Sequence, residues 1–359
     1  MFSNPFVLSF CLLLSLPILF LLVPRILPPP TPLPPPITLS DEVDDLSLFN
    51  RAASSSSSFS RLSSPNPKLK IAFLFLTNSD LHFSPLWNRF FKKADQDLYN
   101  IYIHADPTAN ITLPRGVFNS KLISSKRTYR ASPTLVSAAR RLLATAILDD
   151  PANVYFALLS QHCIPLHSFK YAYHSLITST TFDFSSLSSE SVSEFGVRLK
   201  YKSFIEIISK DRRLWKRYVA RGRYAMLPEV PFNKFRVGSQ FFVLTRKHAL
   251  LVVKDRTLWK KFRKPCYRAD ECYPEEHYFP TLLSMQDPNG STHYTLTRVN
   301  WTGSRNGHPY TYKPSEVSPQ LIYNLRESNY SESYLFARKF SSDSLRPLMK
   351  IADSVIFRD

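Results

Sequence analysis

Three short runs of apolar residues stand out along the chain. Residues 70–77 (KIAFLFLT), 100–106 (NIYIHAD) and 154–159 (VYFALL) are rich in aromatic and branched side chains and contain few polar positions. A continuous apolar run of this length is typical of a strand that is buried on both faces. Each run therefore predicts a central strand of a sheet that is covered on both sides.

Helical patterns separate and follow these runs. In residues 132–149, apolar side chains recur at helical spacing after an opening Ser-Pro pair, which is an N-cap followed by a proline at the first helical position. Residues 238–245 and 293–299 predict two later strands, and residues 248–254 predict a helix between them. Alternating strands and helices favour a largely parallel sheet, with ligands at the carboxyl ends of its strands. We therefore expect one α/β domain over residues 67–359.

The amino terminus carries a longer apolar run. As a helix, residues 6–23 would span roughly 27 Å, close to the thickness of the hydrocarbon core of a bilayer. No basic residue precedes the run and no A-x-A-like site follows it, which favours an uncleaved signal anchor over a cleaved signal peptide. We expect a short cytoplasmic tail at residues 1–5, a single transmembrane helix at residues 6–23, and a lumenal remainder.

A stretch of biased composition follows this run. Residues 28–36 read PPPTPLPPP, which is typical of an extended polyproline rod. Residues 41–45 are mostly acidic and residues 54–58 are all serine, and such compositions bury too little apolar surface to offset the entropy lost on ordering. We therefore expect residues 24–66 to form a disordered, Pro/Ser-rich stem.

The positive charge of the chain belongs to the globular domain. The chain has 46 basic and 28 acidic residues, a formal net charge of +18, yet residues 1–66 contain only three basic and four acidic residues. Such an excess favours an anionic partner. The basic stretches 200–223 and 254–268 are interleaved with aromatic residues. This pattern is found on nucleic-acid-binding surfaces and also on solvated helix faces, and the expected lumenal location argues against nucleic acid.

The glycines exclude two phosphate-binding motifs. None of the seven glycines lies in a GxGxxG or GxxxxGK[ST] pattern, so the chain has neither a dinucleotide fingerprint nor a phosphate loop.

Sequons and cysteines fit a lumenal domain. Four N-x-[ST] sequons predict glycosylation at Asn110, Asn289, Asn300 and Asn329. Cys266 and Cys272 are close enough in sequence to close a small disulfide loop, and Cys163 is expected to be a buried thiol. No second close-spaced pair of cysteines or histidines completes the four ligands of a zinc site.

Seven sequence blocks follow one another over the globular domain. They are residues 71–77 (IAFLFLT), 101–107 (IYIHADP), 157–166 (ALLSQHCIPL), 235–249 (FRVGSQFFVLTRKHA), 272–282 (CYPEEHYFPTL), 298–309 (RVNWTGSRNGHP) and 335–340 (LFARKF). In this order they resemble the plant BC10-like members of the core-2/I-branching β-1,6-N-acetylglucosaminyltransferase family. The resemblance covers essentially all of residues 68–359. It implies a GT-A-like fold, a type II anchor in the Golgi membrane, a UDP-sugar donor, and an inverting transfer without a metal.

An inverting transfer has two chemical requirements. A carboxylate must take the proton of the attacking hydroxyl, and positive groups must stabilise the departing diphosphate. Glu276 matches the catalytic glutamate of the family, although an acid in the first turn of a helix is ordinarily there to complement the helix dipole. The resemblance therefore implies that Glu276 is the general base.

The resemblance also implies the donor-binding residues. In this family an arginine and a lysine replace the metal; Lys339 matches the lysine, and Arg338 and Arg326 are candidates for the arginine. Asp106 resembles the residue that contacts the nucleotide. The D-x-D motif at residues 95–97, a pattern that holds a metal in many GT-A enzymes, precedes a predicted strand, and we expect it to be surface charge.

The acceptor side is less defined by the sequence. Amides pair with sugar hydroxyls and an indole face packs on a sugar ring, which makes Gln161, Gln240 and Trp301 candidates for acceptor binding. Relatives often have Trp-Gly where this chain has Arg-Ala at residues 130–131, and Ser-Glu where it has Ser-Gln at residues 160–161. The donor sugar and the acceptor therefore stay open, between N-acetylglucosamine on mucin-type glycans, as in animal relatives, and another sugar on a cell-wall or arabinogalactan acceptor.

Two other functions compete with this interpretation. The first is a catalytically silent carbohydrate-binding or scaffold protein on the same fold, against which the retention of Glu276, Lys339 and Trp301 argues. The second is a glycoside hydrolase, which needs a second carboxylate across the sugar. Glu275 is only a nominal partner for that role, because adjacent side chains on a helix diverge.

Overall fold

The computed structural model describes residues 13–15, 37–55, 68–112, 114–178, 202–304 and 307–359. The chain divides into two compact units, Met1–Pro35 and Pro36–Asp359. In the first unit residues 13–15 are helical, and the rest of the predicted anchor at residues 6–23 lies outside the described residues. Within the described part of the chain, no helix has the length and apolar character needed to cross a membrane.

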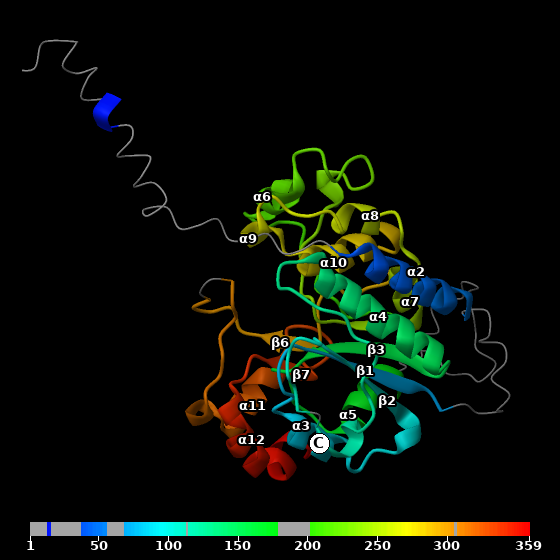
Figure 1. Cartoon of the computed structure of the whole chain (residues 1–359). Helices are drawn as coiled ribbons and strands as arrows, with labels where there is room; N and C mark the ends of the chain where they lie inside the picture. Colours follow the sequence, from blue (N-terminus) through cyan, green and yellow to red (C-terminus); the bar gives the residue numbers. More distant parts are fainter. Residues whose placement is uncertain (1–12, 16–36, 56–67, 113, 179–201, 305–306) are drawn as a thin grey trace, which may run out of the picture. The chain divides into compact units, whose positions relative to one another are not determined.

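The second unit is built on a four-stranded sheet with the order β2-β1-β3-β5 (Figure 1). Strand β1 (Lys70–Thr77) lies between β2 (Tyr99–Ala105) and β3 (Asn153–Ser160) and pairs in parallel with both. Strand β5 (Val243–Thr245) adds an antiparallel edge next to β3. All eight residues of β3 are buried, as the continuous apolar run predicts. The predicted α/β fold with a mostly parallel sheet is confirmed.

Helices cover both faces of this sheet. Alternate residues of each strand point to opposite faces, and both faces are apolar and must be buried. In β1, Phe73 and Phe75 face one apolar layer, whereas Leu74 and Leu76 face the other. The first layer is completed by α3 (Ser84–Phe91), α5 (Phe169–Tyr173) and α12 (Leu345–Ile351). The second layer is completed by α4 (Pro133–Asp149), α7 (Arg246–Lys254) and α10 (Pro274–Gln286).

A smaller sheet follows the carboxyl end of β3. Its order is β4-β7-β6, with β4 (Ile164–Pro165) antiparallel and β6 (Thr297–Val299) parallel to β7 (Phe336–Arg338). The backbone N–H of Phe340 donates to the carbonyl of His162 (3.4 Å). The end of β7 therefore lies beside the turn that follows β3.

Two predicted strands are shorter than the sequence suggested. Only the last three residues of 238–245 form β5, and only the last three of 293–299 form β6. Residues 238–240 turn instead around the start of α10, where the Gly238 N–H donates to the carbonyl of Glu276 (2.9 Å). A Cβ at position 238 would lie 1.8 Å from the carbonyl oxygen of Glu206, so glycine is required at this close approach.

Helix α2 (Leu39–Ser54) lies in the range that the sequence predicted to be a disordered stem. It contacts α4 and α7 (Figure 1) and buries Phe49 and Ala52 against them. The second compact unit accordingly begins at Pro36, not at residue 67. The prediction of disorder is therefore wrong for residues 39–54.

Charge pairing explains why this acidic helix is ordered. Every acidic residue of α2 pairs with a base of the domain: Asp41 and Asp44 with Lys126, Glu42 with Arg263, and Asp45 with Arg141. The last pair is bidentate, at 2.5 and 2.8 Å, and both side chains are buried. From composition alone, we expected these carboxylates to be solvated in a disordered segment. In the structure, basic side chains of the domain neutralise them.

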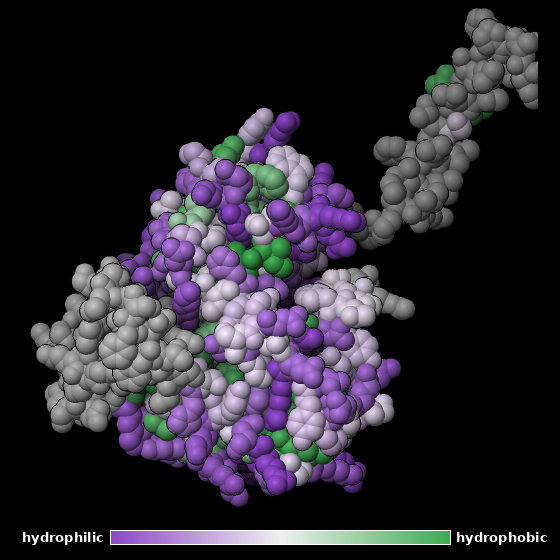
Figure 2. Space-filling view, turned by 180° about the vertical axis from the view of Figure 1, so that it is seen from behind, coloured by the Kyte–Doolittle hydropathy of each residue, from purple (hydrophilic) through white to green (hydrophobic). Residues whose placement is uncertain are grey.

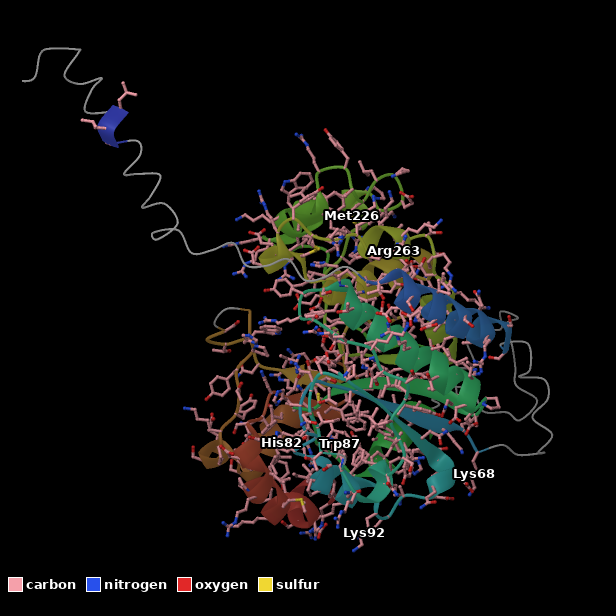
Figure 3. The ribbon with its side chains drawn as sticks, viewed as in Figure 1. Lys68, His82, Trp87, Lys92, Met226 and Arg263 are labelled. Atoms are coloured by element: carbon pink, nitrogen blue, oxygen red, sulfur yellow. A yellow bond between two sulfur atoms is a disulfide. The ribbon has the colours of Figure 1, made fainter. Side chains whose placement is uncertain are left out.

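A small lobe stands at one end of the second unit. It consists of residues 209–236 and 256–272, with α6 (Leu214–Tyr218), α8 (Trp259–Phe262) and α9 (Ala269–Cys272). We call this the α6–α9 lobe; Met226 and Arg263 mark it in Figure 3. The structure joins Cys266 and Cys272 in a disulfide inside the lobe.

Shorter elements and one further helix complete the described chain. Helix α11 (Pro319–Arg326) precedes β7, and single turns of 3-10 or π helix occur at Gln96–Leu98, Gly116–Phe118, His174–Thr178, Val219–Arg221, Phe232–Lys234, Pro314–Glu316, Ser342–Ser344 and Ala352–Ile356.

Replacing Asp45 tests whether α2 is an integral part of the domain. We expect Asp45→Ala to lower the free energy of unfolding by about 3–5 kcal/mol, because it leaves the Arg141 guanidinium buried without its partner. In the matched control Asp44→Ala, an exposed carboxylate is lost while Lys126 keeps its pair with Asp41, which should cost less than about 1 kcal/mol. Urea unfolding followed by tryptophan fluorescence measures both, and equal effects would show that α2 is not docked through Asp45.

Candidate active site

Polar side chains gather where the three parallel strands end. Asn78 follows β1, Asp106 follows β2, and Gln161 follows β3. The Gln161 amide Nε2 donates to Asn78 Oδ1 (2.7 Å), which joins two of these strand ends directly. The site thus lies at the edge of the sheet where a parallel α/β fold places its ligands.

Glu276 reaches this edge from the first turn of α10. Pro274 opens the helix, and Glu275 and Glu276 follow in its first turn, where the helix dipole favours negative charge. Oε2 of Glu276 accepts a hydrogen bond from a guanidinium nitrogen of Arg217 (2.5 Å), and both side chains are largely screened from solvent. Among the described residues, Oε1 of Glu276 has no hydrogen-bond partner, so one carboxylate oxygen is fixed and the other is available.

Arg217 is itself held in place by two ring systems. Its guanidinium lies 5.1 Å from the centre of the Tyr273 ring and 3.4 Å from His277 Nε2. His277 Nδ1 is 2.7 Å from the carbonyl of Arg236, which can only accept, so Nδ1 carries the proton and Nε2 accepts from Arg217. Burial, together with the nearby positive charges, lowers the pKa of His277 to about 3 and keeps the ring neutral.

Glu275 serves a different purpose from its neighbour. Its side chain is buried, and Oε1 accepts from the backbone N–H of Ala131 (3.0 Å). Ala131 has a φ of 55°, a conformation that an L-residue adopts only when its surroundings hold it. Burial and, secondarily, the charge of Glu276 raise the pKa of Glu275 to about 8. Glu275 therefore acts as a mostly neutral clamp on the loop at residues 130–131.

That loop brings Arg130 into the site. A guanidinium nitrogen of Arg130 lies 2.6 Å from His308 Nε2, another donates to the carbonyl of Gly307 (3.3 Å), and the group lies 5.7 Å from the centre of the Tyr273 ring. Arg130 and Arg217 thus both contact Tyr273. Arg130 therefore adds a cation next to Tyr273, the ring that also contacts the arginine paired with Glu276.

Two further cations come from the end of β7. The Arg338 guanidinium lies 4.4 Å from the centre of the Phe241 ring, and its buried Nε has no hydrogen-bond partner. The Lys339 side chain is partly buried, and burial followed by the charges of Arg338 and Arg130 lowers its pKa. Within the described chain, none of these three residues, Arg130, Arg338 and Lys339, forms an ion pair. We call them the cationic cluster.

The positive field of this cluster extends to two histidines. Burial first, and then the charges of Lys339 and Arg338, lower the pKa of His162 to about 4. Burial and the charges of Arg130, Lys339 and Arg338 lower the pKa of His308 as well. Uncompensated charges of one sign are costly, and an anionic ligand would neutralise them.

The candidate base and the cationic cluster share one site. The charge of Glu276 opposes the burial that lowers the pKa of Arg338, and the charge of Arg130 opposes the burial that raises the pKa of Glu275. Arg217, which pairs with Glu276, and Arg130 of the cluster also lie against the same ring, that of Tyr273. The structure brings together the residues that the sequence predicted for the base and for most of the cationic clamp.

Arg326 lies elsewhere, contrary to the prediction that it binds the donor. Its guanidinium donates to the carbonyls of Leu166, Val355 and Ile356 and pairs with Asp359 (3.3 Å). These contacts anchor the end of the chain. The sequence alone could not show whether this arginine anchors the chain end or binds phosphate, because both roles need only an arginine near the carboxyl terminus.

Asp106 lies at the predicted strand end and faces its own loop. One carboxylate oxygen accepts from the backbone and hydroxyl of Thr108, and the other from the backbone and hydroxyl of Thr128. Burial acts to raise the pKa of Asp106, and these hydrogen bonds outweigh it and lower the pKa. Asp106 therefore shapes the loop between the strand end and residue 128.

The three acceptor candidates lie on three different segments of the chain. Gln161 lies at the end of β3, and half-buried Gln240 follows the turn at Gly238 that contacts the backbone of Glu276. Trp301 is 52% exposed and belongs to the loop that also carries His308.

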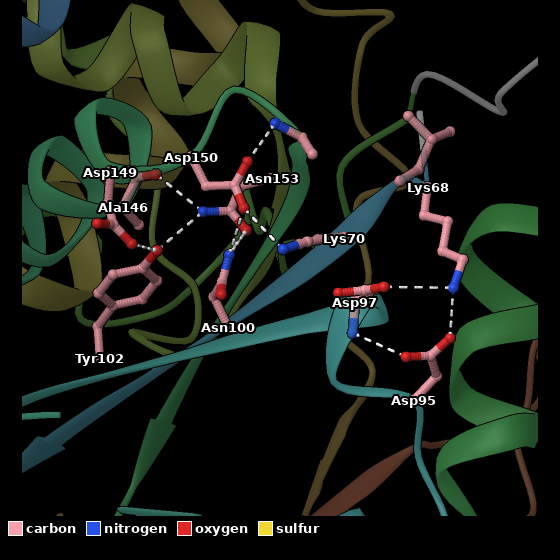
Figure 4. A network of polar contacts seen from close by, with 12 residues as sticks. Lys68, Lys70, Asp95, Asp97, Asn100, Tyr102, Ala146, Asp149, Asp150 and Asn153 are labelled. Atoms are coloured by element: carbon pink, nitrogen blue, oxygen red, sulfur yellow. Dashed lines mark hydrogen bonds and ion pairs between the residues drawn. The ribbon is translucent and has the colours of Figure 1, made fainter. Parts of the chain in front are cut away.

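The D-x-D motif lies at the opposite edge of the sheet. Asp95 and Asp97 flank the start of β2 and pair with Lys68 at 2.6 and 3.4 Å (Figure 4). The same edge is closed by a polar network that includes the Lys70–Asp150 ion pair (2.9 Å). Over the described residues, no group of three or more His, Cys, Asp or Glu side chains is arranged to hold a metal ion.

The remaining predicted modification sites are on the surface or in loops. Asn110, Asn289 and Asn329 are exposed, whereas Asn300 is half-buried and its side chain accepts from the backbone of Thr302. Cys163 is a free, buried thiol beside Ser160, as expected.

Sequence reasoning missed Arg217 and Glu206. Arg217 lies in the basic stretch 200–223, and nothing in the sequence indicates which of its arginines turns inward. Burial and the charge of Glu276 raise the pKa of Glu206, so this carboxyl is also electrostatically coupled to the site. Both residues act on Glu276 from a segment that is about 60 or more residues away in the chain.

Comparisons with known proteins identify the class of enzyme to which the chain belongs. The chain belongs to the Core-2/I-Branching enzyme family, whose model matches residues 71–202 and 182–326. It is 28% identical over 329 residues, covering 77% of this chain and 75% of the relative, to the protein named Glycosyltransferase BC10 of Oryza sativa subsp. japonica. The family resemblance seen in the seven blocks is therefore confirmed, and the protein is a glycosyltransferase.

The buried carboxyl of Glu275 predicts a specific dependence of stability on pH. The folded protein keeps this proton up to about pH 8, whereas the unfolded chain releases it near its ordinary pKa of 4.5. The free energy of unfolding should therefore fall as pH rises from 4.5 to 8, by an amount on the order of a few kcal/mol.

The variant Glu275→Gln isolates this effect, because it is uncharged and still accepts from the Ala131 N–H. Between pH 4.5 and pH 8 its unfolding free energy should fall less steeply than that of the wild type, as measured by urea titrations at several pH values. The exposed control Glu327→Gln should follow the wild type. Identical slopes for Glu275→Gln and wild type would contradict the assignment.

Proposed function

We propose that the protein transfers a sugar, N-acetylglucosamine or a related one, from a UDP-sugar to a hydroxyl of a glycan or cell-wall acceptor. In this proposal the transfer inverts the anomeric centre and needs no metal, on a GT-A-like arrangement of the parallel sheet. One observation carries the proposal: the Glu276 carboxylate has one oxygen free and lies within electrostatic reach of Arg338, which belongs to a cluster of three cations that form no ion pair within the described chain.

Glu276 is the proposed general base. Its free Oε1 takes the proton of the acceptor hydroxyl while that oxygen attacks the anomeric carbon of the donor sugar. The new bond forms as the bond from the anomeric carbon to the diphosphate oxygen breaks, and UDP leaves with that electron pair. Arg217 fixes the orientation of the carboxylate through Oε2, so that one oxygen is aimed before the substrate arrives.

The cationic cluster is the proposed clamp on the leaving diphosphate. Arg130, Arg338 and Lys339 carry charge that no described carboxylate neutralises, and Arg338 keeps a buried Nε–H without an acceptor. Charge-assisted hydrogen bonds to phosphate oxygens would satisfy these donors and would strengthen as negative charge develops on the leaving group. This supports a metal-independent mechanism, in which side chains supply the positive charge.

We also propose the cellular setting from the sequence. The apolar run at residues 6–23 is the anchor of a single-pass type II Golgi membrane protein, with the catalytic domain in the lumen. The exposure of Asn110, Asn289 and Asn329 supports their use as glycosylation sites in that compartment.

Two alternatives make different predictions. A silent carbohydrate-binding protein on this fold would bind sugars without releasing UDP. A hydrolase using Glu275 as a second carboxylate conflicts with the burial of that side chain and its bond to Ala131.

Turnover of a UDP-sugar tests the base. We expect the full chain to release UDP from at least one member of a UDP-sugar panel, and Glu276→Gln to slow this release about 10²–10⁴-fold, the usual contribution of a general base. The exposed control Glu327→Gln should retain wild-type turnover. UDP release that persists in Glu276→Gln would exclude this residue as the base, and no release at all would favour the silent protein.

Binding of UDP tests the clamp. We expect Lys339→Ala to raise KM for the UDP-sugar and Ki for UDP about 10–100-fold, because one hydrogen bond from a charged group is lost. Lys339→Arg keeps the charge and should restore part of the affinity, and the exposed control Lys350→Ala should change neither constant. A chelator should leave the wild-type rate unchanged. Loss of turnover in chelator would contradict metal independence.

A further inference from the structure

The α6–α9 lobe concentrates the positive charge of the protein. Its residues, 209–236 and 256–272, include fifteen basic and four acidic side chains. The lobe therefore has a formal net charge of 15 minus 4, or +11, and the whole chain has +18. Figure 2 shows hydrophilic side chains with apolar patches among them at the end of the molecule that carries this lobe. A surface with such an excess of one charge attracts anionic ligands.

Most of these charges have no internal partner. Arg217, Lys261 and Arg263 form ion pairs, with Glu276, Glu229 and Glu42 respectively. By contrast, none of the exposed basic side chains at positions 216, 223, 260, 264 and 268 forms an ion pair within the described chain. They are free to bind an anion.

Large aromatic side chains are exposed among these cations. Trp215 is 49%, Tyr224 70% and Tyr267 79% exposed. The Trp215 indole stacks on Tyr218, with ring centres 5.8 Å apart, and meets Phe232 edge to face at 5.0 Å, so its orientation is fixed while half of its surface stays open. Exposed, fixed aromatic faces are binding groups for flat apolar surfaces such as the C–H face of a pyranose ring.

The lobe is built as a rigid platform. The Cys266–Cys272 disulfide packs on Ala220, and the backbone N–H of Arg268 donates to the Ala220 carbonyl (3.3 Å). The Tyr218 hydroxyl donates to the carbonyl of Val230 (2.8 Å). Rigid binding groups lose little conformational entropy when a ligand binds.

The platform is continuous with the candidate active site. Trp215 and Arg217 belong to the same short helix, α6, and Arg217 holds Glu276. A polymer lying on the lobe would therefore be close enough to present one of its hydroxyl groups to the base.

We propose that the α6–α9 lobe is a docking surface for an anionic polysaccharide, a polymer whose sugar rings carry carboxylates. The aromatic faces would take the rings, and the unpaired arginines and lysines would take the carboxylates. This inference rests on the proposed function, because it makes that polymer the acceptor or a part of it.

A matched pair of polymers tests the charge requirement. Polygalacturonate carries a carboxylate on every ring, and its fully methyl-esterified form has the same backbone without charge. We expect the full chain to bind polygalacturonate at least tenfold more tightly than the ester, with an affinity that falls as salt rises. Equal affinity for the two polymers would overturn the proposal.

Lobe variants locate the binding surface. We expect the triple variant Arg223→Gln, Lys264→Gln, Arg268→Gln to lose at least tenfold in affinity for polygalacturonate, and Trp215→Ala to weaken the binding of both polymers several-fold. The control triple variant Lys92→Gln, Arg346→Gln, Lys350→Gln makes the same charge change at exposed positions elsewhere and should bind as the wild type. Unchanged binding by the lobe variants would overturn the proposal.

Two further measurements separate the possible outcomes. The first is UDP release measured without an acceptor, which the lobe triple variant should leave unchanged. If the wild type itself releases no UDP, that result counts against the proposed function and not against the docking surface. A single-stranded oligonucleotide and vesicles of anionic phospholipid serve as competing probes. If either binds through the lobe residues and polygalacturonate does not, the surface belongs to nucleic acid or to a membrane, and the polysaccharide proposal is wrong.

Discussion

The ion pair between Arg217 and Glu276 connects the parts of this protein on which the proposed chemistry depends. It joins α6 to the first turn of α10, and so links the basic lobe to the edge of the parallel sheet. The same bond occupies one oxygen of the carboxylate and leaves the other available. Because Arg217 also rests on Tyr273 and His277, the geometry of Glu276 is set by packed rings as well as by charge.

Charge is distributed unevenly around this pair. On one side, Arg130, Arg338 and Lys339 repel one another and depress the pKa of neighbouring histidines. On the other, Glu275 keeps its proton because burial penalises its ionised form. The two adjacent glutamates of α10 therefore differ: partly exposed Glu276 is oriented by Arg217, and buried Glu275 holds the loop that carries Arg130.

The same excess of positive charge explains a feature outside the site. Helix α2 is acidic, and each of its carboxylates finds a base on the surface that it covers. An acidic segment that would be solvated in a neutral protein becomes part of the folded unit here. The domain therefore uses its charge in two ways, to order its own amino-terminal helix and to leave a cationic surface unneutralised on the lobe.

Local patterns in the sequence were sufficient for the strands β1 to β3, for α4, and for the position of Glu276 at the start of a helix, because these depend on neighbours within a few residues. The family resemblance supplied the roles proposed for Glu276 and Lys339. The tertiary structure alone decided that Arg217 turns inward, that Arg326 anchors the chain end, and that α2 is ordered. Each of these is settled by a partner distant in sequence, and one arginine cannot be told from another until the fold places a carboxylate or a carbonyl beside it.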